Sequence, residues 1–589
     1  MSDIDAKKRP GRAFWGLSAT CAWAILLLSC APAPQGAGPG GEGKAGTVTG
    51  PKTLRIGSLR EPDTDIALFQ GSTGDTGGLW PALYFHSGLT VYDAEGKATP
   101  RLAAKIPSVQ DGDWKVLPEG GMEVTWKLRP NVKWHDGQPF TSADLLLGAQ
   151  TLKDPELDYV PRGAFLSSVS GFAAPDPQTF VMTWNQIYIL ANEIGPRDVP
   201  AIASHVVGQL YASGDKVAYR NSPYWGREWV GLGPYRIGER VPGSHLEGIA
   251  FDEYFLGRPK IDRIVIRFFS DVNVMIAPVI SGDLDFVHAG AFSSAHAQTL
   301  RQQWQSQGGG TITQYPIGLS YNPFNFGIPE LPWVKDVRLR RALVHMMDRQ
   351  AYVEEQQFGQ TKVADTLPIP ADPLYKLVEQ RGLSRYPYDL AQAQRLMGEG
   401  GWTRGADGLY RNASGQTFDI VASTSAVSDD SVRATLIVSG MWKAAGLNAT
   451  SDSVPSTAPA EVGRRARSEL HGVWSNVSVY NKATAMDEMQ TSQIRVDNNG
   501  IAIGRNSYRY SNPVFDRAFD KYYQALDPNQ RMEARADVLK IVSDDVPFIP
   551  LFYAFQTISQ AVRKGVTGPG PLPGNQASSG WNMHEWDIT

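Results

Sequence analysis

Three short stretches of the chain alternate apolar and polar residues, and this alternation predicts β-strands. The stretches are residues 54–59, 123–128 and 261–268. In the last one, Ile264 and Ile266 share one face of the expected strand, whereas Arg263 lies on the other. Each stretch is therefore predicted to be a strand with one apolar face.

Five other stretches repeat apolar residues at the 3.6-residue spacing of an amphipathic helix. Four of them follow a residue that can cap a helix N-terminus, namely Ser142, Asp336, Asp389 and Asn512. The fifth places Met532, Ala536 and Leu539 on one apolar face and ends before Pro547. Because strands and helices are mixed without a regular period, the pattern predicts an α/β or α+β fold.

The first thirty residues have the layout of a secretory signal. Four basic residues between positions 7 and 12 precede an apolar run at 13–28, which is short for a membrane span. The run ends Leu-Leu-Ser-Cys at Cys30, which resembles the bacterial lipobox. Residues 1–29 are therefore predicted to be a signal peptide, and Cys30 a lipidated residue that holds the protein on a membrane surface. An ordinary signal peptide or an uncleaved anchor is the alternative.

The composition narrows the range of partners and chemistry. Residues 30–51 are rich in Pro, Gly and Ala and cannot bury enough apolar surface to fold, so they are predicted to be a flexible tether. Cys21 and Cys30 are the two cysteines, and both precede the expected folded body, which excludes thiol chemistry and cysteine-based metal sites there. Lys and Arg total 56 against 60 Asp and Glu, a formal net charge of -4. Nucleic acid is therefore not an expected partner.

Residues 126–144 read WKLRPNVKWHDGQPFTSAD. This stretch closely resembles a signature of family 5 of the extracellular solute-binding proteins of ABC transporters, a family of peptide, oligopeptide and nickel binders. Further matches follow in the family's order as far as about residue 565, among them VGLGPY at 230–235, SGDLD at 281–285 and DVRLRRA at 336–342. Ordered matches over such a span are more specific than any one short motif.

The resemblance implies a two-lobed fold of the periplasmic-binding-protein type II class, of the large cluster C type, with an extra inserted domain and a hinge. A ligand that touches both lobes would favour the closed state. The hinge is expected near Pro316 and Phe555. The implied domains are lobe I at 52–90, 225–315 and 556–589, an inserted domain at 91–224, and lobe II at 316–555.

The resemblance also indicates where a ligand is held. Peptide-binding members commonly place an aspartate shortly after a tryptophan to hold the ligand's ammonium group. The corresponding segment here begins at Trp474 and carries Asn476 in that neighbourhood, and an amide does not offset a buried positive charge. This departure leaves peptide-like, sugar-like and amphiphilic ligands open. The predicted ligand contacts are Trp474, Asn476, Tyr480, Tyr321, Asn322 and Asn325.

Each of these contacts has an alternative structural role. Trp474 and Tyr321 are equally suited to core packing, and the asparagines to turn formation. A metal role for His288 and His296 is a further alternative to ordinary surface or core histidines.

Two other functions are considered as alternatives for this sequence. A secreted hydrolase is one, although the Gly-x-Ser-x-Gly, His-Glu-x-x-His and phosphate-loop motifs are absent. A sensor that presents its ligand to a receptor is the other. The expected protein is a monomeric binding protein and not an enzyme, without cofactor or metal. Its expected partners are an ABC permease and ATPase complex and a small peptide, peptide-like or oligosaccharide-like ligand.

Overall fold

The computed structural model describes residues 50–59, 61, 80–94, 97–157, 168–196, 198–288, 291–314, 318–370, 372–426, 429–455, 460–479, 486–502, 504–554, 559–570 and 580–589. Residues 51–589 form one compact unit. The predicted signal peptide, Cys30, the tether up to residue 49, Tyr480 and the predicted hinge residues Pro316 and Phe555 lie outside the described residues.

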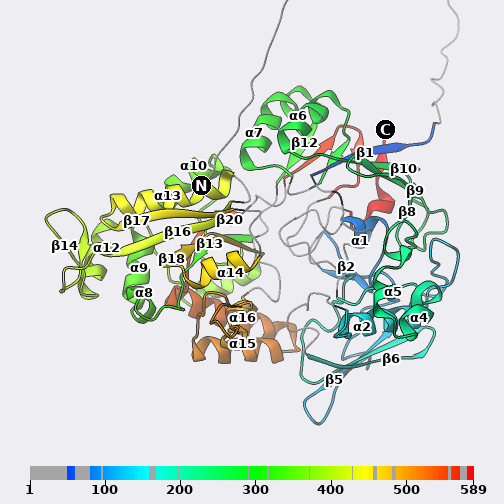
Figure 1. Cartoon of the computed structure of the whole chain (residues 1–589), viewed down its shortest axis with the longest axis horizontal. Coiled ribbons are helices and arrows are strands. Elements are labelled where there is room, and N and C mark those ends of the chain that lie inside the picture. The colour runs from blue at the N-terminus through cyan, green and yellow to red at the C-terminus, as the bar shows by residue number, and fades with distance from the viewer. Residues whose placement is uncertain are drawn as a thin grey trace, which may run out of the picture. The chain divides into compact units, whose positions relative to one another are not determined.

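The largest sheet among the described residues has seven strands drawn from distant parts of the chain (Figure 1). In spatial order its strands are β12 (Gly310–Thr313), β21 (Gln560–Arg563), β11 (Phe286–Val287), β1 (Thr53–Ser58), β10 (Arg263–Phe268), β9 (His245–Ala250) and β8 (Tyr235–Val241). β1 runs parallel to β10 and β11, and β21 runs antiparallel between β11 and β12. The helices α6 (Val272–Ser281) and α7 (Ser294–Gln303) belong to the same region of the chain.

A second, antiparallel sheet is built within residues 114–184. Its strands in order are β4 (Trp114–Val116), β5 (Met122–Lys127), β7 (Thr179–Trp184) and β6 (Val169–Asp176). Figure 1 shows a group of helices beside it: α2 (Ser142–Lys153), α4 (Ser204–Ala212) and α5 (Lys216–Arg220). Trp126 and Trp184 are fully buried in the core of this region, so these tryptophans pack and do not recognise a ligand.

Two three-stranded sheets lie among the described residues in the later part of the chain. One is parallel and has the order β17 (Asn448–Pro455), β16 (Asp419–Ala426) and β18 (Gly472–Trp474), and α13 (Asp429–Ala444) lies along it (Figure 1). The other is antiparallel and has the order β19 (Asn476–Val479), β13 (Gly318–Pro323) and β20 (Phe548–Ala554).

The remaining elements surround these sheets. The longer helices are α9 (Val337–His345), α10 (Arg349–Gln357), α11 (Pro373–Gln380), α12 (Leu390–Glu399), α14 (Ala460–Ser468), α15 (Pro513–Gln524) and α16 (Pro528–Asp545). Short helices are α1 (Trp80–Tyr84), α8 (Pro332–Lys335) and the 3-10 turns at 223–225, 305–307, 487–489, 491–493 and 583–585. Short strand pairs are β2 (Thr90–Tyr92) with β3 (Ala98–Pro100), β14 (Thr403–Arg404) with β15 (Tyr410–Arg411), and β22 (Val566–Thr567) with β23 (Asp587–Ile588).

The helix starts confirm most of the capping predictions. The Asp336 side chain accepts a hydrogen bond from the Arg338 backbone N–H at 2.9 Å, and Asp389 and Asn512 cap α12 and α15 in the same way. At α2 the capping position is Thr141, so the prediction that Ser142 caps this helix is wrong by one residue. Of the predicted inner face of α16, Ala536 and Leu539 are buried, whereas Met532 in the first turns of the helix is 40% exposed.

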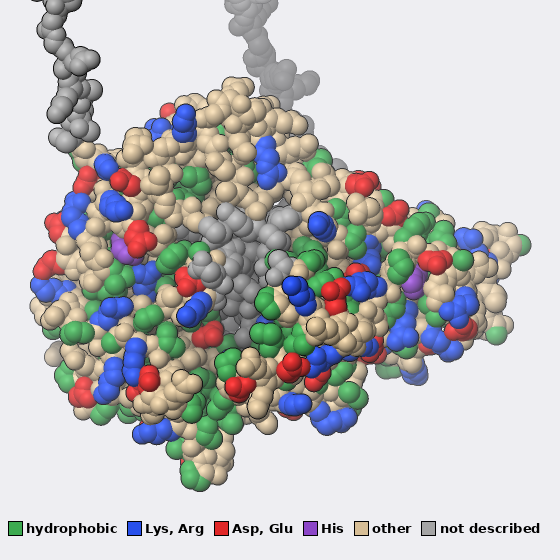
Figure 2. All heavy atoms as spheres, turned by 180° about the vertical axis from the view of Figure 1, so that it is seen from behind, with side chains coloured by type: hydrophobic (Ala, Val, Ile, Leu, Met, Phe, Trp, Pro, Cys, Tyr) green, Lys and Arg blue, Asp and Glu red, His purple; other side chains and the backbone are tan. Residues whose placement is uncertain are grey.

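The surface carries both signs of charge. On the face shown in Figure 2, Lys and Arg side chains are interspersed with Asp and Glu side chains, as the nearly balanced composition predicts. None of the helices in the described ranges has the length and apolar character that a membrane crossing requires.

Candidate ligand-binding site

The site is built where the chain passes from the parallel sheet to the antiparallel sheet. Trp474 ends β18 and Asn476 begins β19, and Ser475 between them donates its backbone N–H to the Ser423 oxygen at 2.9 Å. Asn476 is the register partner of Tyr321 on β13. The change of sheet therefore brings Trp474, Asn476 and Tyr321 to the same place.

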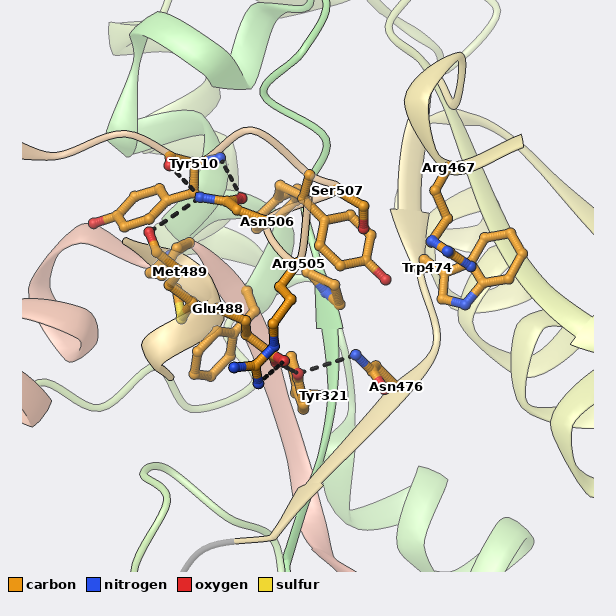
Figure 3. Close-up of a pocket in the computed structure, with 15 residues that line it drawn as sticks. Tyr321, Arg467, Trp474, Asn476, Glu488, Met489, Arg505, Asn506, Ser507 and Tyr510 are labelled. Carbon is orange, nitrogen blue, oxygen red and sulfur yellow. Dashed lines mark hydrogen bonds and ion pairs between the residues drawn. The ribbon is translucent and has the colours of Figure 1, made fainter. Parts of the chain in front are cut away.

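These three side chains line a cavity of about 290 Å³ (Figure 3). Its lining residues among those described are Tyr321, Pro323, Phe324, Arg467, Trp474, Asn476, Glu488, Met489, Arg505, Asn506, Ser507, Tyr508, Tyr510, Pro547 and Phe548. Aromatic faces with a few converging polar groups are typical of a small-molecule site, and this volume is at the lower end of the range for such sites.

A chain of hydrogen bonds crosses one wall of the cavity (Figure 3). The Asn476 amide donates to the Tyr321 hydroxyl at 3.0 Å, and that hydroxyl donates to the Glu488 carboxylate at 3.2 Å. Burial raises the pKa of Tyr321 well above its usual value, and the charge of Glu488 adds to this. The hydroxyl therefore stays protonated and orients both neighbours.

Arg505 holds the acidic part of the same wall. Its guanidinium forms an ion pair with Asp487 at 2.7 Å and lies 3.7 Å from the Glu488 carboxylate. Burial acts to lower the pKa of Arg505, but Asp487 and Glu488 outweigh it and raise the pKa above the usual value. The guanidinium therefore stays charged, and its ion pair with Asp487 fixes the turn that carries Glu488.

The opposite wall consists of a tryptophan and an arginine. The Arg467 guanidinium carbon lies 5.4 Å from the centroid of the Trp474 ring, which is a cation–π contact. Arg467 is in the last turn of α14 and Trp474 is at the end of β18. Figure 3 shows this pair facing Arg505 and Glu488 from the other side.

Asn506 connects two segments of the cavity wall by hydrogen bonds. Its amide nitrogen donates to the backbone oxygens of Met489, Gln490 and Tyr510, and its amide oxygen accepts from the Tyr510 N–H at 3.1 Å. A single buried side chain thus joins the turn at 487–490 to the loop at 505–510. The relative position of Glu488 and Tyr508 depends on it.

The six predicted ligand contacts do not all come together. Tyr321, Trp474 and Asn476 line the cavity, whereas Tyr480 lies outside the described residues. Asn322 and Asn325 are buried but do not line this cavity. Asn325 donates to the Ser468 and Leu470 backbone oxygens and accepts from the Gly327 N–H, so it joins backbone segments.

The charged residues of the cavity were not among the sequence predictions. Arg467, Glu488 and Arg505 come from a helix, a 3-10 turn and a loop that share no motif. Glu488 also supplies a carboxylate that the segment after Trp474 lacks. The departure from the family pattern at Asn476 left the ligand class open, and no local sequence signal pointed to the charged residues of this cavity.

One glycine beside the site allows β18 to approach β16 closely. A Cβ atom on Gly472 would lie 1.8 Å from the Val421 backbone oxygen. We expect Gly472→Ala to lower the free energy of unfolding by about 1–3 kcal/mol, since the strands must move apart. Urea unfolding measures this. Gly440→Ala in α13, where a Cβ meets nothing within 4 Å, is the matched control and is expected to stabilise by up to about 1 kcal/mol. A neutral effect of Gly472→Ala would contradict the close approach.

Residues 97–494 match the family described as bacterial extracellular solute-binding proteins, family 5 Middle. A Brucella ovis protein named as an ABC transporter peptide-binding protein is 26% identical over 367 residues, which cover 61% of this chain and 62% of that protein. The matched region thus spans less than two thirds of that relative. The oligopeptide-binding protein AppA of Bacillus subtilis is 22% identical over 551 residues, or 93% of this chain and 94% of that protein.

The fold agrees with solved structures. An oligopeptide-binding protein from Thermus thermophilus, in complex with a pentapeptide, has a TM-score of 0.70 to this chain at 21% identity and covers 91% of this chain and 96% of that one. This likeness confirms the predicted fold class, a mixed α/β fold of the periplasmic binding-protein type. Because the family match spans more than half of the chain, this protein belongs to the family 5 bacterial extracellular solute-binding proteins.

Proposed function

We propose that this protein is the solute-binding component of an ABC importer and captures a small peptide or peptide-like ligand outside the cytoplasm. The cavity beside Tyr321 and Trp474 carries the proposal, because it offers aromatic faces and converging polar groups within the fold of the family. Relatives named as peptide-binding and oligopeptide-binding proteins favour a peptide as the ligand class. Glu488 is an acidic group that can face a ligand ammonium, so the missing aspartate after Trp474 does not argue against peptides.

We propose that ligand capture closes lobe I (52–90, 225–315 and 556–589) and lobe II (316–555) over the cavity. The proposed hinge lies near Pro316 and Phe555. Ser294 on α7 donates to the Gln357 side chain at 2.8 Å, and Arg301 donates to Gln360 at 2.7 Å. Both bonds join the proposed lobe I to the proposed lobe II, so opening would break them. A ligand would shift the population toward the closed state by its additional contacts there.

The test is retention of peptides by the purified protein. The protein is mixed with a library of dipeptides and tripeptides, desalted and denatured, and the released solutes are identified by mass spectrometry. We expect a subset of peptides to be retained while the composition of the library stays unchanged. Steady cleavage of the peptides would support the alternative, a secreted hydrolase, and retention of no peptide would contradict the proposed ligand class.

Replacing Trp474 is predicted to weaken binding of the retained peptides. Loss of the aromatic face in Trp474→Ala is expected to cost about 1–3 kcal/mol of binding free energy, which isothermal titration with a retained peptide measures. Trp402→Ala is the control, because Trp402 packs against Phe418 and does not line the cavity. Equal affinities of the two variants would remove Trp474 from the site.

The anchor and the transport role need tests in cells. We propose that a lipid on Cys30 holds the mature protein on a membrane, and the mass of the mature N-terminal peptide checks this.

Deletion of the protein is expected to abolish uptake of a labelled, retained peptide. Unaltered uptake would instead favour a sensor that presents its ligand to a receptor.

A further inference from the structure

A segment of the proposed inserted domain is buried in the apolar core of the proposed lobe II. Ile189 follows β7 and is 0% exposed. It belongs to the same apolar cluster as Leu319 and Tyr321 on β13 and Met486. Apart from Ile189, the buried members of that cluster come from residues 319–553. Ile189 is therefore the fully buried side chain that the inserted domain contributes to this core.

Lobe II packs against the inserted domain in return. Tyr523 at the end of α15, and Leu526 just after that helix, lie against the apolar core of the inserted domain. The Tyr188 ring stacks on Trp184 with ring centroids 4.9 Å apart, and its centroid lies 6.3 Å from that of the Tyr523 ring. Tyr188 thus connects a core residue of the inserted domain to lobe II.

Polar groups of both parts meet beside this apolar contact. Burial raises the pKa of Glu193, which accepts a hydrogen bond from Tyr92 at 2.8 Å, and the positive charge of Arg531 on α16 acts against this rise. Burial also raises the pKa of Tyr188, and nearby carboxylates, among them that of Asp487, add to it. A contact that mixes one apolar side chain with charged groups is typical of domains that move relative to one another.

Two buried polar atoms near this contact have no hydrogen-bond partner among the described residues. They are the Tyr523 hydroxyl and the Oδ1 atom of Asp487. A buried polar atom without a partner costs free energy, and water returns that free energy once the atom is exposed. The docked arrangement is therefore opposed by a cost that separation of the two parts relieves. This favours a contact that forms and breaks over a permanent one.

Met486 connects the contact to the ligand cavity. It shares the apolar cluster with Ile189, and the 3-10 turn at 487–489 that follows it carries Glu488 into the cavity (Figure 3). Met486 has a φ of +75°, in the left-handed region that residues other than glycine rarely adopt. Such a conformation persists only where the surroundings hold it. The packing to which Ile189 contributes therefore holds the turn that positions Glu488.

We propose that Ile189 is a positioning residue for the ligand site: when the lobes close, it enters the lobe II cluster and fixes the turn that carries Glu488. This inference rests on the proposed solute-binding function and deepens it, because it gives the inserted domain a part in ligand capture. In the open state Ile189 is exposed to solvent, and the turn relaxes. A ligand that contacts Glu488 favours the docked state, and docking in turn raises the affinity for that ligand.

The first experiment measures the exposure of residue 189 with a thiol. Full-length Ile189→Cys is treated with iodoacetamide without ligand, and mass spectrometry follows alkylation of the peptide that contains position 189. Leu319→Cys is the matched control, because Leu319 is equally buried in the same cluster but belongs to lobe II alone. We expect Ile189→Cys to be alkylated at least about tenfold faster than Leu319→Cys, and a retained peptide to slow its alkylation.

The second experiment separates positioning from ordinary core packing. Ile189→Ala is expected to weaken binding of a retained peptide about tenfold, mainly through faster dissociation, and Ile189→Val to stay within about threefold of the wild type. The urea midpoint of ligand-free Ile189→Ala is expected to equal that of the wild type, because the side chain is already exposed in the open state. Titration calorimetry, dissociation kinetics and urea unfolding give these three quantities.

Equally slow alkylation of both cysteine variants without ligand would overturn the inference, since Ile189 would then be a permanent part of the core. A lowered urea midpoint of ligand-free Ile189→Ala with unchanged affinity would overturn it as well. Both results would leave the proposed function standing, because peptide retention by the wild type is measured separately. Retention of no peptide by the wild type would contradict the proposed ligand class, whereas fast alkylation of ligand-free Ile189→Cys would still support reversible docking.

Discussion

Replacement of Arg349 by methionine is expected to lower the free energy of unfolding by about 3–5 kcal/mol. The guanidinium is 5% exposed and donates to the backbone oxygens of Ala364, Tyr386 and Pro550 at 2.8–3.0 Å and to the Asp365 carboxylate at 3.0 Å. Methionine fills a similar space but donates no hydrogen bond. Three carbonyl groups would then lose a hydrogen-bond donor, and Asp365 would keep only its longer ion pair with Arg385 at 3.4 Å.

The Arg349→Met substitution is also expected to lower the affinity of the cavity for its ligand. Pro550 on β20 is the register partner of Tyr321, so movement of β20 displaces a cavity residue. Urea unfolding gives the stability, and titration with a retained peptide gives the affinity. Arg395→Met is the control: Arg395 is 61% exposed and pairs with Glu399 on one helix, so a change within about 0.5 kcal/mol is expected. Similar effects of the two substitutions would contradict this account.

Asp285→Asn is expected to destabilise the protein by about 2–4 kcal/mol. Asp285 is 1% exposed and accepts hydrogen bonds from Arg55 on β1 and from Arg563 on β21 at 2.5–2.9 Å. Its loss leaves two guanidinium groups without their carboxylate. Both arginines are about a third exposed, at 38% and 30%, and water screens part of the cost.

The control for Asp285 is the same substitution at an exposed ion pair. Asp252 is 78% exposed and pairs with Arg258 at 2.7 Å, so Asp252→Asn is expected to change the free energy of unfolding by no more than about 0.5 kcal/mol. A loss of less than about 1 kcal/mol in Asp285→Asn would show that the buried carboxylate does not hold these strands together.

Local patterns predicted the elements of this protein well. Asp336, Asp389 and Asn512 begin helices as their capping chemistry requires, because a cap depends on neighbours within one turn. The predicted strand at 261–268 begins two residues later, at Arg263. The error at Thr141 and Ser142 arises because adjacent residues offer the same hydroxyl, and the backbone geometry alone decides between them.

The candidate site could be predicted only in part, because its walls come from segments distant in the sequence. Trp474, Asn476 and Tyr321 were reached through the resemblance of their segments to a family, and they line the cavity. Arg467 and Glu488 lie on a helix end and a short turn, where charged residues are ordinarily solvated. No local pattern distinguishes a charge that faces water from one that faces a cavity.

The position of β21 in the largest sheet has a consequence for the order of folding. β1 and β21 come from opposite ends of the chain, and both are needed beside β11 before the sheet is complete. The Lys52 and Asp587 side chains, 2.5 Å apart, form another contact between residues that are far apart in the sequence. Such non-local pairing is slow and cannot finish while β21 is still being synthesised. The largest sheet of a nascent chain therefore stays incomplete until β21 has been synthesised, and its apolar faces are available to other proteins until then.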